Sequence, residues 1–113
     1  MELPSKSEKV KKLIIQATLA HQKDIACHLY WAAIRTYVFN TLEFNDVSFN
    51  STESALTKFI ELADDELAIS VNSSYSIGIM TGWDHSYTEE NGLLEGLEVI
   101  KETAMRLQLI EPK

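Results

Sequence analysis

Residues 24–44 read DIACHLYWAAIRTYVFNTLEF, from Asp24 to Phe44, and this stretch decides the fold. It spans about six helical turns and contains no glycine or proline. Apolar residues lie on most of its sides, with small alanines placed among large aromatic side chains. A helix that is apolar nearly all round is buried by its neighbours rather than laid on a surface. The sequence therefore predicts that this segment is the central helix of a small bundle.

A first helix is predicted before this segment, over residues 5–22. Ser5 and Glu8 have the spacing of a capping box, in which each side chain satisfies a free backbone N–H. Residues 21–23 form a polar joint between two apolar helical patterns, and we predict a tight turn there. The alternative is one continuous helix of about 40 residues, which is long for a compact small domain.

Two further helices are predicted after the central one, which should end near Phe44 because Asn45 and Asp46 favour a turn. Asn50 to Glu53 offers a second capping signal, and a short amphipathic helix follows it. Asp64 to Glu66 either begins a fourth helix near Leu67 or bends the third one.

The helical signal weakens between Val71 and Met80, where Asn and Ser side chains compete for backbone hydrogen bonds. We predict that the fourth helix ends near Tyr75, with a single unpaired strand as the alternative. Residues 81–87 are predicted as a loop, and Thr88 as the cap of the last helix. Apolar residues in that helix recur at spacings typical of a packing seam. They are Leu93, Leu97, Ile100, Ala104 and Leu107.

Length and composition narrow the possible functions of the chain. Residues 1–113 are expected to form a single all-α domain, an up-and-down bundle of four to five helices. We expect no secretory signal and no membrane span, and the lone cysteine, Cys27, fits a reducing cytoplasm. Glycine-rich phosphate loops, CxxC pairs and HExxH motifs are absent from the sequence, which argues against most autonomous small-molecule enzymes.

The net charge of −7 is unevenly distributed along the chain. Residues 1–42 carry six basic and three acidic side chains, whereas the remainder carries four basic and fourteen acidic ones. An acidic domain is a poor binder of nucleic acid, because that affinity depends on neutralising phosphates. The asymmetry allows the basic first helix to meet an acidic partner, or the acidic half to meet a basic one. A solvated surface without a partner is the third interpretation.

Two groups of residues in the sequence are candidates for metal binding or catalysis. His21, Asp24 and His28 would share a face of one continuous helix, and such a set can bind a divalent metal. The predicted turn breaks that face, so we expect neither a metal nor a cofactor. We expect Arg35 to form a structural ion pair with an acid on a neighbouring helix, because a buried arginine is costly without one.

The second group is the segment WDHSY, from Trp83 to Tyr87, where an acid, an imidazole and hydroxyls follow one another. Asp84 could orient His85 as a general base, with Ser86 nearby. Adjacent residues rarely point into one site, however. The competing interpretation is a loop anchored on the bundle by its two aromatic rings.

The segment ATLAHQKDIACHLYWAAIRTYVFNTLE, from Ala17 to Glu43, resembles the core of the HEPN superfamily, the higher-eukaryote and prokaryote nucleotide-binding domains. The segment VSFNSTESALTKFIELA, from Val47 to Ala63, is similar to the crossover and third helix of that family. A long loop and a terminal amphipathic helix complete the resemblance, which covers most of the chain. It implies a helical dimer that pairs with a nucleotidyltransferase-like or toxin–antitoxin partner.

Many HEPN proteins are ribonucleases with an Arg-x4-6-His motif in a composite dimer site, and this sequence departs from that pattern. Its two arginines, Arg35 and Arg106, are not followed by a histidine at the required distance. We therefore expect a non-catalytic prokaryotic or archaeal protein that acts as a homodimer or binds a partner protein. The alternative is a diverged ribonuclease or nucleotide-processing enzyme that uses Arg35, Asp84 and His85.

Overall fold

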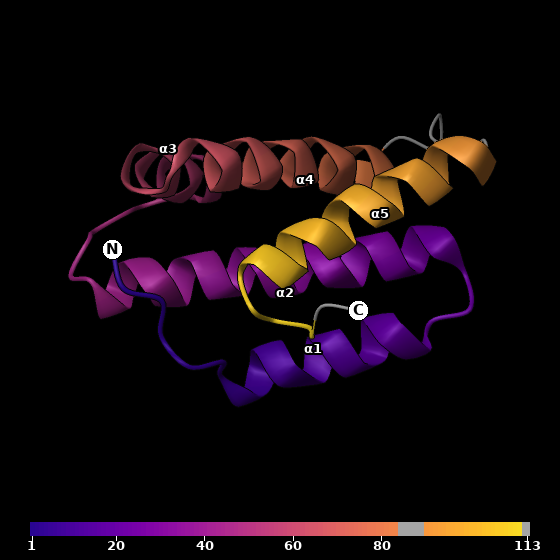
Figure 1. Ribbon diagram of the computed structural model, residues 1–113, viewed down its shortest axis with the longest axis horizontal. Helices are drawn as coiled ribbons and strands as arrows, with labels where there is room; N and C mark the ends of the chain where they lie inside the picture. Colours follow the sequence, from indigo (N-terminus) through magenta and orange to yellow (C-terminus); the bar gives the residue numbers. More distant parts are fainter. Residues whose placement is uncertain (84–89, 112–113) are drawn as a thin grey trace.

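Figure 1 shows the computed structural model of the chain, which describes residues 1–83 and 90–111, with the backbone alone at 80–83 and 90–92. The described residues form five helices and no strand, which confirms the predicted all-α bundle. None of these helices is both long and apolar enough to cross a membrane. The helices are α1 (Glu8–Leu19), α2 (Lys23–Phe44), α3 (Thr52–Leu62), α4 (Asp65–Trp83) and α5 (Glu90–Arg106).

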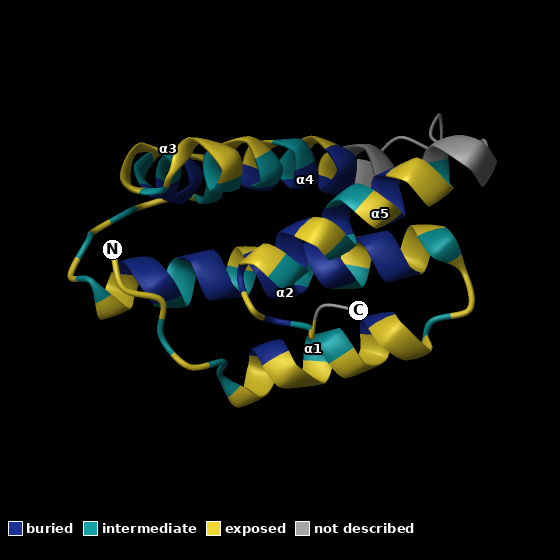
Figure 2. Cartoon of the chain, in the orientation of Figure 1, coloured by how far each residue is buried: buried dark blue, intermediate teal, exposed yellow. Residues whose placement is uncertain are grey.

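Helix α2 is the centre of the bundle, as the sequence predicts. It packs against α1 on one side and against α3, α4 and α5 on the others (Figure 1). Figure 2 shows buried residues along most of α2, whereas α1 exposes most of its outer face. The buried side chains of α2 are Ala26, Cys27, Tyr30, Trp31, Ala33, Ile34, Tyr37, Val38, Thr41 and Leu42.

Helix α1 begins later than the predicted start at Ser5. Ser7 is the N-cap, and its hydroxyl accepts a hydrogen bond from the Val10 N–H at 3.2 Å. The preceding residues are held elsewhere, because the Tyr37 hydroxyl donates to the Pro4 carbonyl oxygen at 2.6 Å. This contact ties the chain before Ser7 to α2, so the capping box expected between Ser5 and Glu8 is wrong.

The predicted turn between the first two helices is confirmed. Helix α1 ends at Leu19 and α2 begins at Lys23, with Ala20 and Gln22 in extended conformations. The alternative of one continuous helix of about 40 residues is therefore wrong. The turn lets α1 fold back antiparallel along α2, which buries Val10 and Ala17 in the core.

Helices α3 and α4 are separate, and each begins at a side-chain cap. The Ser51 hydroxyl accepts from the Ser54 N–H at 3.0 Å, and the Asp64 carboxylate accepts from the Leu67 N–H at 2.8 Å. Between them, Ala63 is extended and ends α3. The capping signals in the sequence therefore predict both starting points within a few residues.

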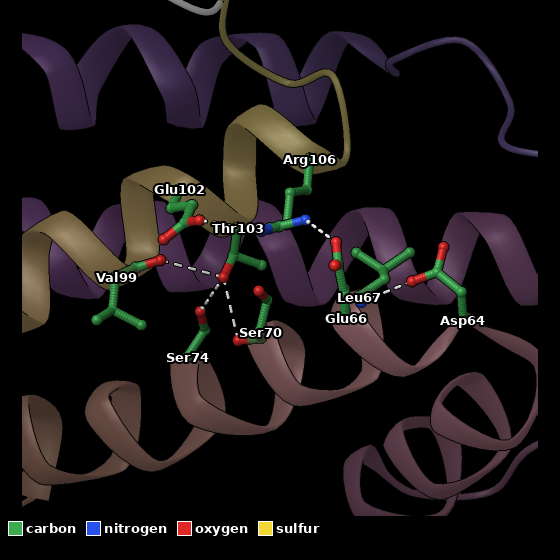
Figure 3. A network of polar contacts seen from close by, with 9 residues as sticks. All are labelled: Asp64, Glu66, Leu67, Ser70, Ser74, Val99, Glu102, Thr103 and Arg106. Atoms are coloured by element: carbon green, nitrogen blue, oxygen red, sulfur yellow. Dashed lines mark hydrogen bonds and ion pairs between the residues drawn. The ribbon is translucent and has the colours of Figure 1, made fainter.

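The predicted end of α4 near Tyr75 is wrong, because the helix continues to Trp83. The serines that lower its helix propensity have partners in the structure. Ser74 is buried and donates to Thr103 of α5 at 2.8 Å (Figure 3), and Ser76 bonds the Asn72 carbonyl oxygen. Tertiary packing thus overrides a weak local preference. Of the predicted loop, residues 81–83 are helical and 84–87 lie outside the described residues.

Helix α5 uses the predicted apolar seam. Leu97, Ile100, Ala104 and Leu107 are buried, and Leu93 is partly buried. The seam packs on α2 and α4, so α4 is fixed against both of its long neighbours. That arrangement holds the middle of α4 next to the part of α2 that contains Trp31.

Candidate functional site

A groove of about 720 Å³ lies between α2, the start of α3 and the middle of α4. Its volume falls in the range of small-molecule sites, about 300 to 1,000 Å³. Three chain segments that are distant in the sequence meet around it. The residues that line it are His28, Trp31, Arg35, Ser51, Thr52, Glu53, Tyr75, Gly78 and Ile79.

One wall of the groove is a single face of α2. His28, Trp31 and Arg35 follow one another at spacings of three and four residues, which places them on one side of the helix. His28 and Arg35 are exposed, whereas Trp31 is only 6% exposed. The wall therefore presents two polar nitrogen-bearing groups above a mostly buried indole ring.

The floor is built from α2 and α4 together. The Trp31 and Tyr75 rings are 5.6 Å apart between centroids and are tilted by 50°, a favourable aromatic arrangement. Gly78 makes the approach possible, since a Cβ at this position would lie 2.4 Å from Cγ of Trp31. Only glycine lets the indole lie this close to the backbone of α4.

The third side is the first turn of α3. The Ser51 hydroxyl oxygen accepts from the Ser54 N–H and so caps the helix, while its own O–H remains available to donate. Glu53 is exposed and brings a carboxylate to this side of the groove. The wall on α2 therefore carries the arginine, and the wall on α3 carries an acid.

Within residues 1–83 and 90–111, Arg35 has no acidic partner of the kind that the sequence predicts. Its side chain is exposed on the groove and makes no ion pair with any residue that the structure describes. The prediction assumed that Arg35 is buried, because α2 is apolar on most sides. The gap between α3 and α4 leaves this part of α2 open, and the guanidinium reaches solvent there.

The other predicted catalytic residues, Asp84 and His85, lie outside the described residues, so the structure does not bring them together with Arg35. The alternative metal site is not formed within the described part of the chain. His21 lies in the turn before α2, away from the helical face of Asp24 and His28. Among the described residues, no three His, Cys, Asp or Glu side chains are grouped closely enough to hold a metal ion.

Cys27 lies on α2, is fully buried and does not line the groove. Burial raises the pKa of its thiol to about 11, and the neighbouring Asp24 carboxylate adds to the rise. The thiol therefore stays protonated at neutral pH and is a poor nucleophile. We assign it to the core.

A second surface stands out on the outer side of α4. Ile69, Asn72, Ser76 and Ile79 recur at spacings of three and four residues and are all exposed. The α4 segment from Leu67 to Trp83 contains no Asp, Glu, Lys or Arg, in a chain of which 24% is charged. We call these four side chains the α4 outer face.

Sequence reasoning missed the aromatic floor of the groove and the α4 outer face. The spacing of His28, Trp31 and Arg35 is a local signal that indicates the wall on α2. Tyr75 and Gly78 have no such signal, because their role depends on a contact with a distant helix. The absence of charge after Glu66 is visible in the sequence and becomes informative once the segment is known to be helical and exposed.

Comparison with known proteins found no matching family model, and no curated protein or solved structure that matches the chain significantly. The resemblance to the HEPN superfamily therefore stays a prediction that rests on the residues quoted above.

Proposed function

We propose that this chain is a non-catalytic helical-bundle protein that acts as a homodimer, with the α4 outer face as the contact surface. The observation that carries the proposal is the exposed, charge-free side of α4. Its isoleucines, Ile69 and Ile79, are 67% and 39% exposed. Between them stand the small polar side chains of Asn72 and Ser76.

Charge and shape support a protein contact on this side. The cores of protein–protein interfaces are depleted of charged residues compared with the remaining surface. Small side chains such as Ser76 allow a second helix to approach closely, and the two isoleucines provide apolar area at either end. An exposed helix face that serves only solvation would carry charged residues, as α5 does with Glu95, Glu98 and Glu102.

The absence of charge on the α4 outer face allows a second copy to be the occupant despite the net charge of the chain. A chain of charge −7 repels itself wherever carboxylates face each other, and the acids are concentrated in its second half. The α4 outer face brings no carboxylates into contact. In a two-fold dimer with antiparallel α4 helices, Ile69 of one copy would face Ile79 of the other, as an isologous interface requires.

The HEPN-like resemblance supports the same proposal, because it implies dimerisation and a nucleotidyltransferase-like or toxin–antitoxin setting. The sequence supports the non-catalytic part, since neither arginine is followed by a histidine at the ribonuclease spacing. A basic partner protein would bind the acidic surfaces of the chain, which remain exposed in the proposed dimer.

The test is sedimentation equilibrium of the full chain at micromolar concentrations. We expect a dimer for the wild type and a monomer for Ile69→Glu, because the introduced carboxylate is desolvated at the interface. Ile15→Glu is the matched control, since Ile15 is 58% exposed on α1 and lies away from α4. Circular dichroism checks that each variant is folded.

Three results would contradict the proposal. They are a wild type that stays monomeric, an Ile69→Glu variant that stays dimeric, and an Ile15→Glu variant that dissociates equally. The last result would mean that the dissociation is not specific to the α4 outer face.

A further inference from the structure

We propose that the groove between α2, α3 and α4 binds a small aromatic monocarboxylate. Arg35 would pair with the carboxylate, and the ring would rest on Trp31 and Tyr75. The groove and the α4 outer face share Ile79, which lies at the edge of the groove. The residue that carries this proposal, Arg35, belongs to α2 and not to the α4 outer face, so its substitution tests the groove without changing the dimer contact.

The anion-binding group is Arg35. It is exposed on the groove and has no acidic partner among the residues that the structure describes. The other arginine, Arg106, is held by Glu66 at 3.0 Å and by Glu102 at 3.1 Å (Figure 3). A guanidinium with open donor positions matches the two oxygens of a carboxylate in a bidentate pair.

We infer the aromatic part of the ligand from the floor of the groove, which Trp31 and Tyr75 form. Trp31 and Tyr75 both line the groove with their rings tilted by 50°, and the indole of Trp31 packs directly over Gly78. Ile79 extends this apolar surface at the edge of the groove. Flat apolar ligands gain both buried area and favourable ring geometry on such a floor.

The acidic side chain on the opposite wall of the groove limits the ligand to a single negative charge. Glu53 lines the groove together with Arg35, so the charged side chains of the site are not uniformly basic. A ligand with two or more negative charges would be repelled by Glu53 and by the net charge of −7. A monocarboxylate can turn its charge towards Arg35 and leave its neutral ring towards the floor.

The size of the groove fits a small molecule. Its volume of about 720 Å³ is larger than a single aromatic ring needs, so a two-ring ligand such as an indole carboxylate is accommodated. Indole-3-acetate is therefore a suitable probe, and indole is its neutral counterpart. Indole-3-yl phosphate carries the same ring with a more highly charged group.

The experiment is isothermal titration of the full chain with these three probes. We expect indole-3-acetate to bind at least about tenfold more tightly than indole, the value of one charge-assisted hydrogen-bond pair. Arg35→Gln should abolish this preference, and Arg35→Lys should restore part of it. Arg106→Gln removes the same charge at the other arginine and should keep the wild-type preference.

Several outcomes would overturn the proposal. They are the absence of indole-3-acetate binding, equal affinity for indole and indole-3-acetate, and an equal loss in Arg35→Gln and Arg106→Gln. Tighter binding of the phosphate would assign the groove to polyanions instead. Sedimentation of Arg35→Gln separates the two proposals, because its dimer should persist whether or not the ligand binds.

Discussion

The hydroxyl of Ser74 on α4 donates a 2.8 Å hydrogen bond to the hydroxyl oxygen of Thr103 on α5, and both residues are fully buried. Thr103 Oγ1 also lies 3.0 Å from the Ser70 carbonyl oxygen and 3.1 Å from that of Val99 (Figure 3). Its single proton is shared between these two carbonyls while it accepts from Ser74. The contact joins α4 to α5 and gives a structural role to a serine with poor helix propensity.

Removing either hydroxyl should destabilise the fold. Ser74→Ala is expected to cost about 1 kcal/mol, and Thr103→Val about 1 to 3 kcal/mol, because each change leaves a buried polar group with fewer partners. The double variant should cost less than the sum of the two, since no unpaired hydroxyl remains. Urea unfolding of the four proteins measures this coupling. Additive losses would mean that the two hydroxyls act separately.

Gly78→Ala should destabilise the protein despite the better helix propensity of alanine. The new Cβ would lie 2.4 Å from Cγ and 2.5 Å from Cδ1 of Trp31. The obstacle is a buried ring packed on Tyr75, so it has little room to move. Overpacking costs about 1 to 3 kcal/mol, which exceeds the gain of roughly 1 kcal/mol in propensity.

Thermal unfolding and near-ultraviolet circular dichroism test this expectation for Gly78. The aromatic signal should change, because the indole of Trp31 is displaced. Ser76→Ala is the matched control on the same helix, because alanine keeps a small side chain on the α4 outer face and does not contact Trp31, so its change should stay within about 0.5 kcal/mol. A stabilised Gly78→Ala variant would contradict the close contact.

The Cys27 thiol should make stability fall at alkaline pH. Its pKa is about 11 in the folded protein, because the thiol is buried, compared with 9.0 when it is free. The folded state therefore holds this proton more tightly than the unfolded chain. The stabilisation is fully present below pH 9 and is lost as the pH rises to about 11.

The expected loss is on the order of 2 kcal/mol across that interval. Urea midpoints of the wild type and Cys27→Ala, measured at intervals through this pH range, isolate the contribution of the thiol. The wild type should lose more stability than the variant with rising pH, although the variant is less stable at neutral pH. Parallel curves for the two proteins would show that the thiol does not contribute.

The sequence predicts those features of the fold that depend on local signals. The apolar segment from Asp24 to Phe44 and the cap at Ser51 each lie within one stretch of chain, and the structure confirms both. The continuation of α4 beyond Tyr75 could not be predicted in this way, because Ser74 has its partner on another helix and no local pattern reveals that contact. The candidate site was also only partly predictable. Arg35 is visible in the sequence, but its exposure depends on where α3 and α4 leave α2 open.

Gln108→Gly should stabilise the protein through the end of α5. Gln108 has φ of 62°, in the left-handed region that disfavours side chains with a Cβ. Its N–H donates to the Met105 carbonyl oxygen at 2.9 Å, and that of Leu109 donates to Ala104 at 2.8 Å. This pair of bonds is the Schellman motif, in which glycine is the preferred residue.

Relief of the left-handed strain, about 1 to 2 kcal/mol, exceeds the added chain entropy of glycine, so we expect a gain of about 0.5 to 1 kcal/mol. Asp46→Gly is the matched comparison, because Asp46 follows the C-cap of α2, Asn45, with φ of 58°. Aspartate tolerates this conformation better than glutamine does, so the gain at Asp46 should be smaller. Urea unfolding of both variants ranks them, and a larger gain at Asp46 would mean that backbone strain does not control stability at these two helix ends.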